Sequence, residues 1–499
     1  MTITARIDTD AAAAPALVLT GSGTRPRAVT VSGRRASSEG RLTGRGVSWT
    51  ARVPLHAARW GGGALPLPTG AYAVEITGAD GAPIDLGAEL ADDVPATMTP
   101  TMRVSLSGAT LEVRPPIDPA YESAEGQAAL ERRYATRPKS GRAGLENAVF
   151  FESFYGRNAS CNPRAIDREL ARVAPGVTRY WSVVDLSVAV PDGGIPVVEG
   201  SPAWWRARGS ARLLVVNDWL RRRYERRPGQ VVLQTWHGTP LKRLALHRPG
   251  FDPRRALAVV RESLRWNVLL AQNPYGERVM RKAYAFLRRP VWVEGYPRND
   301  ALRRGGGGDR TRRALGIGED ERVVLYAPTW RDDRDEIVDF LDLERLAGDT
   351  GAVVLVRGHS RTIPAGSDAH GARIVDVTAY PDVSDLLVAA DALVTDYSSV
   401  MFDYTATGKP ILFFTPDLAD YRERLRGFYF DLGAHAPGPM TTSQADLTAA
   451  LTAALEEGVL PAFVDRYAQW QDMFNARDDG HAAERVVARI LDQRFVDRA

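Results

Sequence analysis

The sequence has almost no cysteine, no long apolar run and no recognisable secretion signal, and these absences favour a reducing compartment. Its 499 residues include one cysteine, Cys161, so a disulfide framework is excluded. No apolar run reaches about eighteen residues, and no membrane-spanning helix is expected. The N-terminus lacks a basic segment and carries Asp8 and Asp10, which argues against a secretion signal. We therefore expect a protein that works in the cytoplasm or on the cytoplasmic face of a membrane.

The sequence also lacks the signatures of several enzyme classes. It contains no GxxxxGKS or GxxxxGKT phosphate loop, no GxSxG turn and no His/Cys cluster with metal-ligand spacing. Asp332 and Asp333 are adjacent, but neighbouring aspartates after a turn are usually solvated. P-loop NTPases, α/β-hydrolases and zinc hydrolases are therefore disfavoured. We expect neither a metal nor a cofactor.

Charge gives a further exclusion. The net charge is only +3, which does not indicate a nucleic-acid partner. Only four of the 64 basic residues are lysines, and arginines cluster at 221–227, 281–289 and 303–313. Residues 218–224 mix aromatic side chains with arginines, as interfacial segments do, and this mixture suggests contact with a membrane surface. Solvated arginine-rich helices are the alternative, and the oligomeric state is left open.

Patterning divides the chain into several parts, because 499 residues are too many for one core. Residues 1–115 alternate apolar and polar side chains between Gly, Pro and Ser turns, which predicts a small β-sandwich or barrel. From residue 146, short apolar runs alternate with amphipathic segments, which predicts parallel α/β sheets. The predicted parts are an accessory β domain (1–115), a linker or helix (116–145), an acceptor-side Rossmann-like domain (146–303), a nucleotide-donor Rossmann-like domain (304–480) and a C-terminal helix (481–499).

The predicted fold class is thus α/β, with two doubly wound Rossmann-like domains behind a small all-β domain. The glycine-rich segment LRRGGGGDR, residues 302–310, separates the two α/β series and predicts a hinge. Two such domains joined by a hinge are typical of the GT-B architecture. Ligands of open α/β sheets bind beyond the carboxyl ends of the strands, and the motifs below all lie at such ends.

The first motif is QTWHGTPLK, which follows the apolar run Val231–Leu233. His237 would face the cleft, where a neutral imidazole can take a proton from a hydroxyl. Gly238 allows close approach or a positive φ, and Pro240 is well placed to open a helix. Thr239 and Lys242 are candidates for the acceptor or phosphate side. The alternative is a buried histidine satisfied by a main-chain carbonyl.

The second domain offers two candidate phosphate sites. Arg357 and His359 follow a strand in VLVRGHS and fall on the same side of an extended segment, where they could clamp a pyrophosphate. In DALVTDYSSVMFDY, Ser398 or Ser399 can cap a helix whose free N–H groups attract an anion. Asp396 would orient a hydroxyl, an amide or a neighbouring cation. The alternatives are a surface arginine with an incidental histidine, and simple helix capping.

A weaker signal is the strand end LYAPTWRDD. Pro328 and Thr329 could form one wall of a nucleotide pocket, or only a βα turn. Together, the two halves offer a histidine each, with basic groups and a helix start for phosphates. This combination predicts metal-independent transfer from a nucleotide-diphospho donor to a hydroxyl acceptor.

Six segments together carry a family resemblance. They are FFESFYGRNASCNPRAI (150–166), QTWHGTPLKRL (234–244), GYPRND (295–300), YAPTWRDD (326–333), VLVRGHS (354–360) and DLLVAADALVTDYSSVMFDY (385–404). In order and spacing, the chain from about 147 to 480 resembles the CDP-glycerol glycerophosphotransferases of teichoic-acid synthesis. The β region before it lies outside the resemblance.

The resemblance implies a GT-B fold and transfer of glycerol phosphate from CDP-glycerol, the donor, with release of CMP. It implies a lipid-linked acceptor and a peripheral position on the cytoplasmic face of the membrane. The essential pair of histidines would be His237 and His359. The cytidine diphosphate site would involve Arg357 and His359 with the turns at Pro328–Thr329 and Asp396–Ser399. One departure is that the second histidine is followed by Ser360 where the family commonly has proline.

The mechanistic hypothesis is that His237 acts as general base on the acceptor hydroxyl, while the second half stabilises the phosphates. Two alternatives remain. The donor could be CDP-ribitol or a nucleotide sugar on the same architecture. The chain could also be a non-catalytic envelope-binding protein with a degenerate transferase domain.

Overall fold

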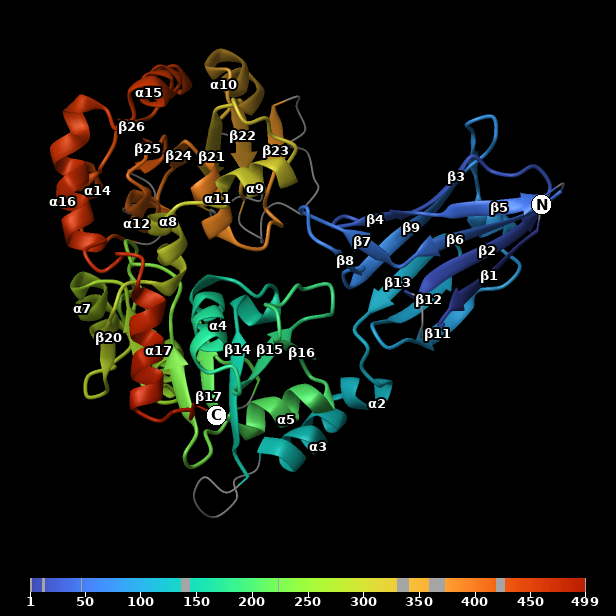
Figure 1. Ribbon diagram of the computed structural model, residues 1–499, viewed down its shortest axis with the longest axis horizontal. Helices are drawn as coiled ribbons and strands as arrows, with labels where there is room; N and C mark the ends of the chain where they lie inside the picture. Colours follow the sequence, from blue (N-terminus) through green and yellow to red (C-terminus); the bar gives the residue numbers. More distant parts are fainter. Residues whose placement is uncertain are drawn as a thin grey trace. The chain divides into compact units, whose positions relative to one another are not determined.

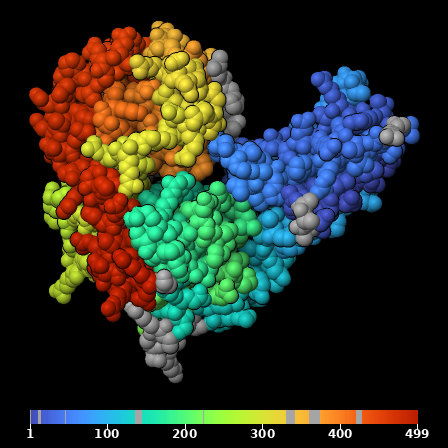
Figure 2. All heavy atoms as spheres, viewed as in Figure 1, coloured from blue at the N-terminus to red at the C-terminus, as the bar shows by residue number. Residues whose placement is uncertain are grey.

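The computed structural model describes residues 2–10, 14–45, 47–135, 144–222, 224–329, 341–358, 373–418 and 427–498. The chain forms two compact units (Figure 1). The first consists of residues 1–136, 181–190 and 196–207, and the second of residues 137–180, 191–195 and 208–499. In Figure 2 the first hundred residues are blue, and the last hundred, which belong to the second unit, are orange to red.

The N-terminal part of the chain is an antiparallel β structure, as the alternating sequence predicts. One sheet has the order β1-β2-β6-β5, a second has the order β11-β12-β13-β9-β3-β4 with β10 beside β9, and β7 pairs with β8. The strands are β1 (Ile3–Asp8), β2 (Ala16–Ser22), β3 (Ala28–Ser32), β4 (Ser37–Glu39), β5 (Arg41–Arg45), β6 (Ser48–Pro54), β7 (His56–Ala58), β8 (Ala64–Pro66), β9 (Gly70–Thr77), β10 (Pro83–Ile84), β11 (Val94–Met98), β12 (Arg103–Ser107) and β13 (Thr110–Arg114).

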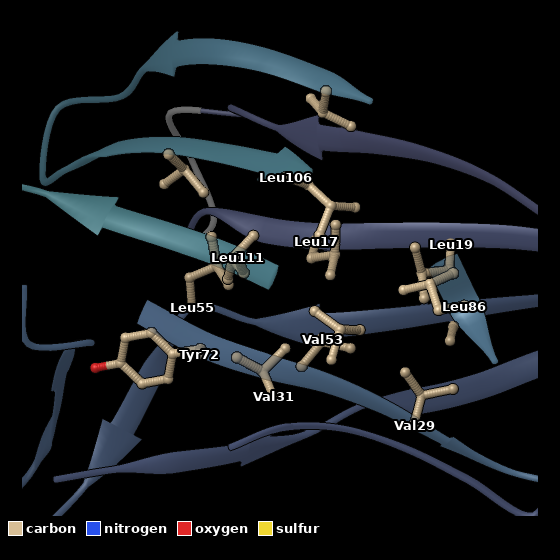
Figure 3. Packing of buried hydrophobic residues seen from close by; sticks show 14 of the residues in the cluster. Leu17, Leu19, Val29, Val31, Val53, Leu55, Tyr72, Leu86, Leu106 and Leu111 are labelled. Carbon is tan, nitrogen blue, oxygen red and sulfur yellow. The ribbon is translucent and has the colours of Figure 1, made fainter. Parts of the chain in front are cut away.

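The core of this part is made by the inward-facing residues of both sheets. Leu17 and Leu19 of β2 and Val29 and Val31 of β3 are fully buried. They belong to one hydrophobic cluster (Figure 3). The period of two residues along each strand explains why these side chains share one face. Three short helices accompany the strands: α1 (Leu86–Glu89), α2 (Pro119–Glu122) and α3 (Ala124–Ala135).

The first of two parallel sheets has the order β16-β15-β14-β17-β18-β19-β20. Its strands are β14 (Glu146–Glu152), β15 (Thr178–Val183), β16 (Ile195–Val198), β17 (Ala211–Val216), β18 (Val231–Gln234), β19 (Val268–Ala271) and β20 (Val291–Val293). Its helices are η1 (Phe154–Gly156), α4 (Cys161–Val173), α5 (Pro202–Ser210), η2 (Ala245–His247), α6 (Pro253–Ser263) and α7 (Pro274–Ala283). We call this sheet with its helices the first lobe.

The second parallel sheet has the order β23-β22-β21-β24-β25-β26. Its strands are β21 (Val323–Ala327), β22 (Val353–Val356), β23 (Ile374–Asp376), β24 (Ala392–Thr395), β25 (Ile411–Phe414) and β26 (Met440–Thr441). Its helices are α9 (Gly308–Ala314), α10 (Leu343–Thr350), α11 (Val383–Ala389), α12 (Val400–Tyr404), η5 (Thr405–Thr407), α14 (Leu432–His435), α15 (Gln444–Glu457), η7 (Pro461–Phe463) and α16 (Val464–Phe474). We call this sheet with its helices the second lobe.

Two short helices and the C-terminal helix connect the lobes: η3 (Pro297–Asn299), α8 (Asp300–Arg304) and α17 (Ala482–Asp492). Helix α17 returns to the first lobe and packs on α4 (Figure 1). The carboxylate of Asp300 accepts the main-chain N–H groups of Ala482 and Ala483, both at 2.9 Å, and so caps α17. The predicted hinge glycines Gly305–Gly307 have positive φ and follow α8, which already packs on α11 of the second lobe.

These elements confirm the predicted fold class. Every strand that the apolar runs predict in the α/β region is present, whereas β26 was not predicted. Within the part of the chain that the structure describes, no single helix has both the length and the apolar composition to cross a membrane. One pair of helical segments, Gln444–Glu457 and Pro461–Phe474, passes that test jointly by length and composition, with a bend of 92° between them.

Candidate active site

His237 lies just beyond the carboxyl end of β18, as predicted. Its Nδ1 is 2.6 Å from the main-chain oxygen of Asn217, which follows the neighbouring strand β17. A carbonyl oxygen can only accept, so Nδ1 carries the proton and Nε2 is the basic nitrogen of the neutral ring. The alternative expected for this histidine, a ring satisfied by a main-chain carbonyl, is therefore present, and it leaves Nε2 as the nitrogen without the proton.

Two aromatic rings flank the imidazole of His237. Trp236 stacks on it with centroids 4.9 Å apart and an interplanar angle of 15°, and Phe154 lies at 5.5 Å, tilted by 54°. Trp236 is buried and also contacts Tyr284 edge-on. Both Trp236 and Phe154 have positive φ, at 53° and 45°. Backbone strain of this kind persists where the surroundings impose it, and it concentrates at functional sites.

Gly238 is required for close approach, not for a positive φ. A Cβ at this position would lie 2.6 Å from Oγ of Ser399, in the second lobe. The prediction that Pro240 opens a helix is wrong. Leu241 accepts the N–H of Tyr429 at 2.9 Å, and Arg243 donates to the carbonyl of Gly427 at 3.1 Å. The chain after His237 is therefore held in an antiparallel bridge to the second lobe.

Thr239 and Lys242 occupy different settings. Thr239 is buried, where its hydroxyl donates to Gln272 at 2.5 Å and accepts from Asn273 at 3.1 Å. Lys242 is half-buried, and its Nζ lies 3.4 Å from Oγ1 of Thr329 in the second lobe. Of the two, Lys242 is the one that reaches from the histidine loop to a predicted donor-side residue.

The turn after β21 is shaped by Asp396. The main-chain N–H of Thr329 donates to both carboxylate oxygens of Asp396, at 2.8 and 3.0 Å, and Tyr397 N–H donates to the same group. Pro328 precedes this anchored residue. Of the partners considered for Asp396, the structure thus shows an amide.

Helix α12 begins where the sequence predicts. Ser399 occupies its N-cap position, but its side chain makes no capping hydrogen bond, and the helix is only five residues long. Ser398 and Ser399 are half-buried. Side-chain capping by Ser399 is therefore not seen, and its hydroxyl lies at the start of α12 beside Gly238 of the histidine loop.

Arg357 lies after β22, where its Nη1 donates to the main-chain oxygens of Val377 and Tyr380, at 3.2 and 3.0 Å. Burial lowers the pKa of Arg357 to about 10, against the opposing effect of Asp382 and Asp376. This arginine thus holds the 377–380 turn in the structure described here. Its predicted partner His359 lies outside the described residues, as do Asp332 and Asp333.

A buried polar cluster near the histidine connects the two lobes. Arg298 of η3 pairs with Asp403 of α12 at 2.5 Å and reaches Sγ of Cys161 at 3.2 Å. Asn299 donates to Asp403 at 2.9 Å and to Asp478 at 3.1 Å. Burial raises the pKa of Asp403, while Arg298, Asn299 and the nearby His237 act to lower it.

Sequence reasoning missed several of these residues. Asn162, Asn217 and Gln234 make the contacts that place the histidine loop, yet none was singled out. Asn162 lies within the quoted segment 150–166, so its position was visible while its partners were not. As for a metal, the described residues contain no group of three or more His, Cys, Asp or Glu side chains that could hold one.

Two parallel Rossmann-like sheets with strand-end loops that meet at His237 define a protein of the GT-B type. Residues 139–492 match the family described as CDP-glycerol:poly(glycerophosphate) glycerophosphotransferase. The chain belongs to this family. The β strands that end at Arg114 lie outside the matched residues.

Individual relatives agree with this assignment. The teichoic acid poly(glycerol phosphate) polymerase of Bacillus subtilis (strain 168) is 35% identical over 366 residues, which are 69% of this chain and 48% of the relative. The teichoic acid glycerol-phosphate transferase of Staphylococcus aureus (strain NCTC 8325 / PS 47) is 34% identical over 69% of this chain and 93% of its own length. The chain thus spans about half the length of the first relative.

A solved structure gives the same result. A variant of the wall teichoic acid polymerase TagF, soaked with CDPG, superposes with a TM-score of 0.66 at 31% identity. The match covers 74% of this chain and 93% of that one.

Proposed function

We propose that the protein transfers glycerol phosphate from CDP-glycerol to a hydroxyl of a lipid-linked acceptor, or of a growing polyol-phosphate chain, and releases CMP. One observation carries the proposal. His237 presents a Nδ1–H tautomer at a strand end, in a loop that meets the Ser399 helix start and the Thr329 turn of the second lobe. Membership of the glycerophosphotransferase family supports the choice of donor.

In this reaction the acceptor oxygen attacks the glycerol-bearing phosphorus of the donor pyrophosphate. The bond from that phosphorus to the bridging oxygen breaks, and CMP leaves with the bridging oxygen. The acceptor proton passes to Nε2 of His237, and the imidazolium later returns it to solvent. The positive charge of Lys242, beside Thr329, stabilises the phosphates in the transition state. We assign His359 and Arg357 to the donor phosphates on the family resemblance.

The test is nucleotide release from defined donors. CDP-glycerol, CDP-ribitol and a UDP-sugar are each incubated with the purified protein and a synthetic lipid-linked acceptor. We expect CMP from CDP-glycerol and a loss of about 100-fold or more in His237→Ala. Release of CMP from CDP-ribitol alone would identify CDP-ribitol as the donor, and release of UDP would identify the nucleotide sugar. Donor binding without any release would favour the non-catalytic envelope-binding alternative.

We further propose that the protein works as a peripheral protein on the cytoplasmic face of the membrane, where a lipid-linked acceptor resides. The segment 218–224, in which aromatic residues and arginines suggest membrane contact, does not supply the apolar surface, because Leu220 and Tyr224 are buried. Helix α6 and the residues next to it supply that surface. Phe251 is 88% exposed, Leu257 50% and Leu264 55%.

Basic residues accompany these exposed apolar side chains. Arg254 and Arg261 lie on the same exposed stripe of α6 as Leu257 and Leu264. Leu287, 66% exposed, lies two residues before Arg289, whose Nη1 donates to the carbonyls of Ser263 and Trp266, at and just beyond the end of α6, both at 2.7 Å. Leucine beside arginine on one helix face suits an anionic lipid interface. We call Phe251, Arg254, Leu257, Arg261, Leu264 and Leu287 the α6 patch.

A further inference from the structure

The loop that carries His237 depends on an unusual backbone turn. Strands β17 and β18 are parallel neighbours, with Val216 opposite Gln234. An extended chain would carry the histidine about 7 Å beyond the level of Asn217, since each residue advances about 3.3 Å. The left-handed conformation of Trp236, with φ of 53°, turns the chain back so that Nδ1 reaches Asn217.

Nothing intrinsic to Trp236 favours this conformation, because a bulky residue with positive φ is strained. Two amide side chains form hydrogen bonds with the peptide groups on either side of Trp236. Gln234 accepts the N–H of Trp236 at 2.9 Å through Oε1. Asn162, fully buried at the start of α4, donates through Nδ2 to the carbonyls of Thr235 and Trp236, both at 3.2 Å.

Asn162 also ties this turn to the segment between the lobes. Its Oδ1 accepts the main-chain N–H of Arg298 at 3.2 Å. The guanidinium of Arg298 pairs with Asp403 on α12, and that helix begins at the Ser399 that faces Gly238. One side chain thus bonds the main chain of the histidine loop and the main chain of the segment between the lobes.

We propose that Asn162 and Gln234 are positioning residues. They hold Trp236 in the left-handed conformation and thereby fix His237 as the Nδ1–H tautomer, with Nε2 free to accept a proton. The kinetic part rests on the proposed transferase function. The tautomer part is a property of the protein alone and can be measured without turnover.

The experiment compares Asn162→Asp and Gln234→Met with wild type. Asn162→Asp keeps the shape of the side chain and removes the Nδ2 donor that bonds the carbonyls of Thr235 and Trp236. Gln234→Met removes the Oε1 acceptor of the Trp236 N–H. Selective ¹⁵N-histidine labelling reports the protonation of each ring nitrogen, and the His237 signal is assigned by its absence in His237→Gln. Asn475→Ala is the control, because Asn475 is a buried amide whose hydrogen bonds go to the carbonyl of Phe402 and to the side chains of Thr405 and Asp478, none of which belongs to residues 234–238.

In wild type at alkaline pH, His237 should show a protonated Nδ1 and a bare Nε2. In both variants we expect a second population protonated at Nε2, a kcat lower by about 10- to 100-fold, and a KM for CDP-glycerol within about 3-fold. Asn475→Ala should keep the wild-type tautomer whatever it does to stability. A single Nδ1–H population in both variants would overturn the proposal, even if kcat fell. If wild type releases no nucleotide, the proposed function fails while the tautomer comparison still decides this inference.

Discussion

Gly238 and Ser399 meet where the first lobe contacts the second. A Cβ on Gly238 would lie 2.6 Å from Oγ and 3.0 Å from Cβ of Ser399, so a larger residue fits only if Ser399 shifts. We expect Gly238→Ala to lower the free energy of unfolding by about 1–3 kcal/mol, as overpacking does, and to slow CMP release. Denaturant unfolding and initial rates measure the two effects.

Two further variants check the cause. Ser399→Gly removes both clashing atoms and should restore the stability of Gly238→Ala. Gly348→Ala in helix α10 is the matched control, because nothing lies within 4 Å of its added Cβ and alanine favours a helix. A Gly238→Ala variant as stable and as active as wild type would mean that the loop does not need this close approach.

The anchoring of Thr329 by Asp396 predicts a separate effect on donor binding. Asp396→Asn keeps the shape but weakens the pair of bonds to Thr329 N–H, so the donor-side turn loses its fixed position. We expect KM for CDP-glycerol to rise about 10-fold with kcat within about 3-fold, since the carboxylate positions the Thr329 turn on the proposed donor side. Asp342→Asn, at the N-cap of α10, is the control. An equal fall in kcat and kcat/KM would instead place Asp396 in transition-state stabilisation.

The buried pair Arg298 and Asp403 predicts asymmetric mutational costs. Asp403→Leu leaves the guanidinium of Arg298 buried without its partner and should lower stability by about 3–5 kcal/mol. The double variant Arg298→Met/Asp403→Leu removes both charges and should recover most of that loss. Urea unfolding gives both values. Arg313→Met, which breaks an exposed pair with Glu319, should change stability by less than about 1 kcal/mol. A double variant no more stable than the single one would show that the pair itself is needed.

Much of this architecture could be predicted because the sequence encodes it locally. Apolar runs such as Val323–Ala327 and Val353–Val356 are buried strands, and strand ends in parallel sheets share one edge. His237 was accessible to this reasoning, because its position depends only on where β18 ends. The short strands β4, β7, β8 and β10 carry too few residues to show alternation.

The details around the histidine depend on contacts between distant residues. Asn162 and Trp236 are 74 positions apart, and their hydrogen bond determines a backbone angle that no local pattern predicts. The same holds for Pro240, where the expected helix is replaced by an antiparallel bridge to residues 427–429. At this point the tertiary hydrogen bonds outweigh the local preference for a helix.

Asp478 predicts a pH dependence of stability. It is buried, and burial raises its pKa to about 6, although it accepts hydrogen bonds from Asn475, Gln272, Tyr296 and Asn299. A raised folded-state pKa means that the stability from the protonated carboxyl is fully present below about pH 4 and is lost as the pH rises through about 6. The loss should reach about 3 kcal/mol between these limits.

The measurement is the unfolding free energy of wild type and Asp478→Asn from pH 4 to pH 7. The advantage of wild type over the variant should shrink by that amount as the pH rises, because the variant cannot ionise. A gap that stays constant or widens would show that the four accepted hydrogen bonds outweigh burial.

The α6 patch predicts salt-dependent membrane binding that mutation can separate from folding. Leu257→Glu/Leu264→Glu replaces two exposed apolar side chains by carboxylates, so the variant loses apolar insertion and gains repulsion from anionic lipid. Flotation with phosphatidylglycerol vesicles at low salt should recover at least about 10-fold less of this variant than of wild type. Val464→Glu/Met473→Glu is the control, since both residues belong to another helix, α16, and are exposed to a similar extent, at 51% and 52%. Equal recovery of all three proteins would mean that another surface contacts the lipid. Electrostatic attachment is strongest at low salt, so no recovery of wild type under that condition would remove the peripheral membrane assignment.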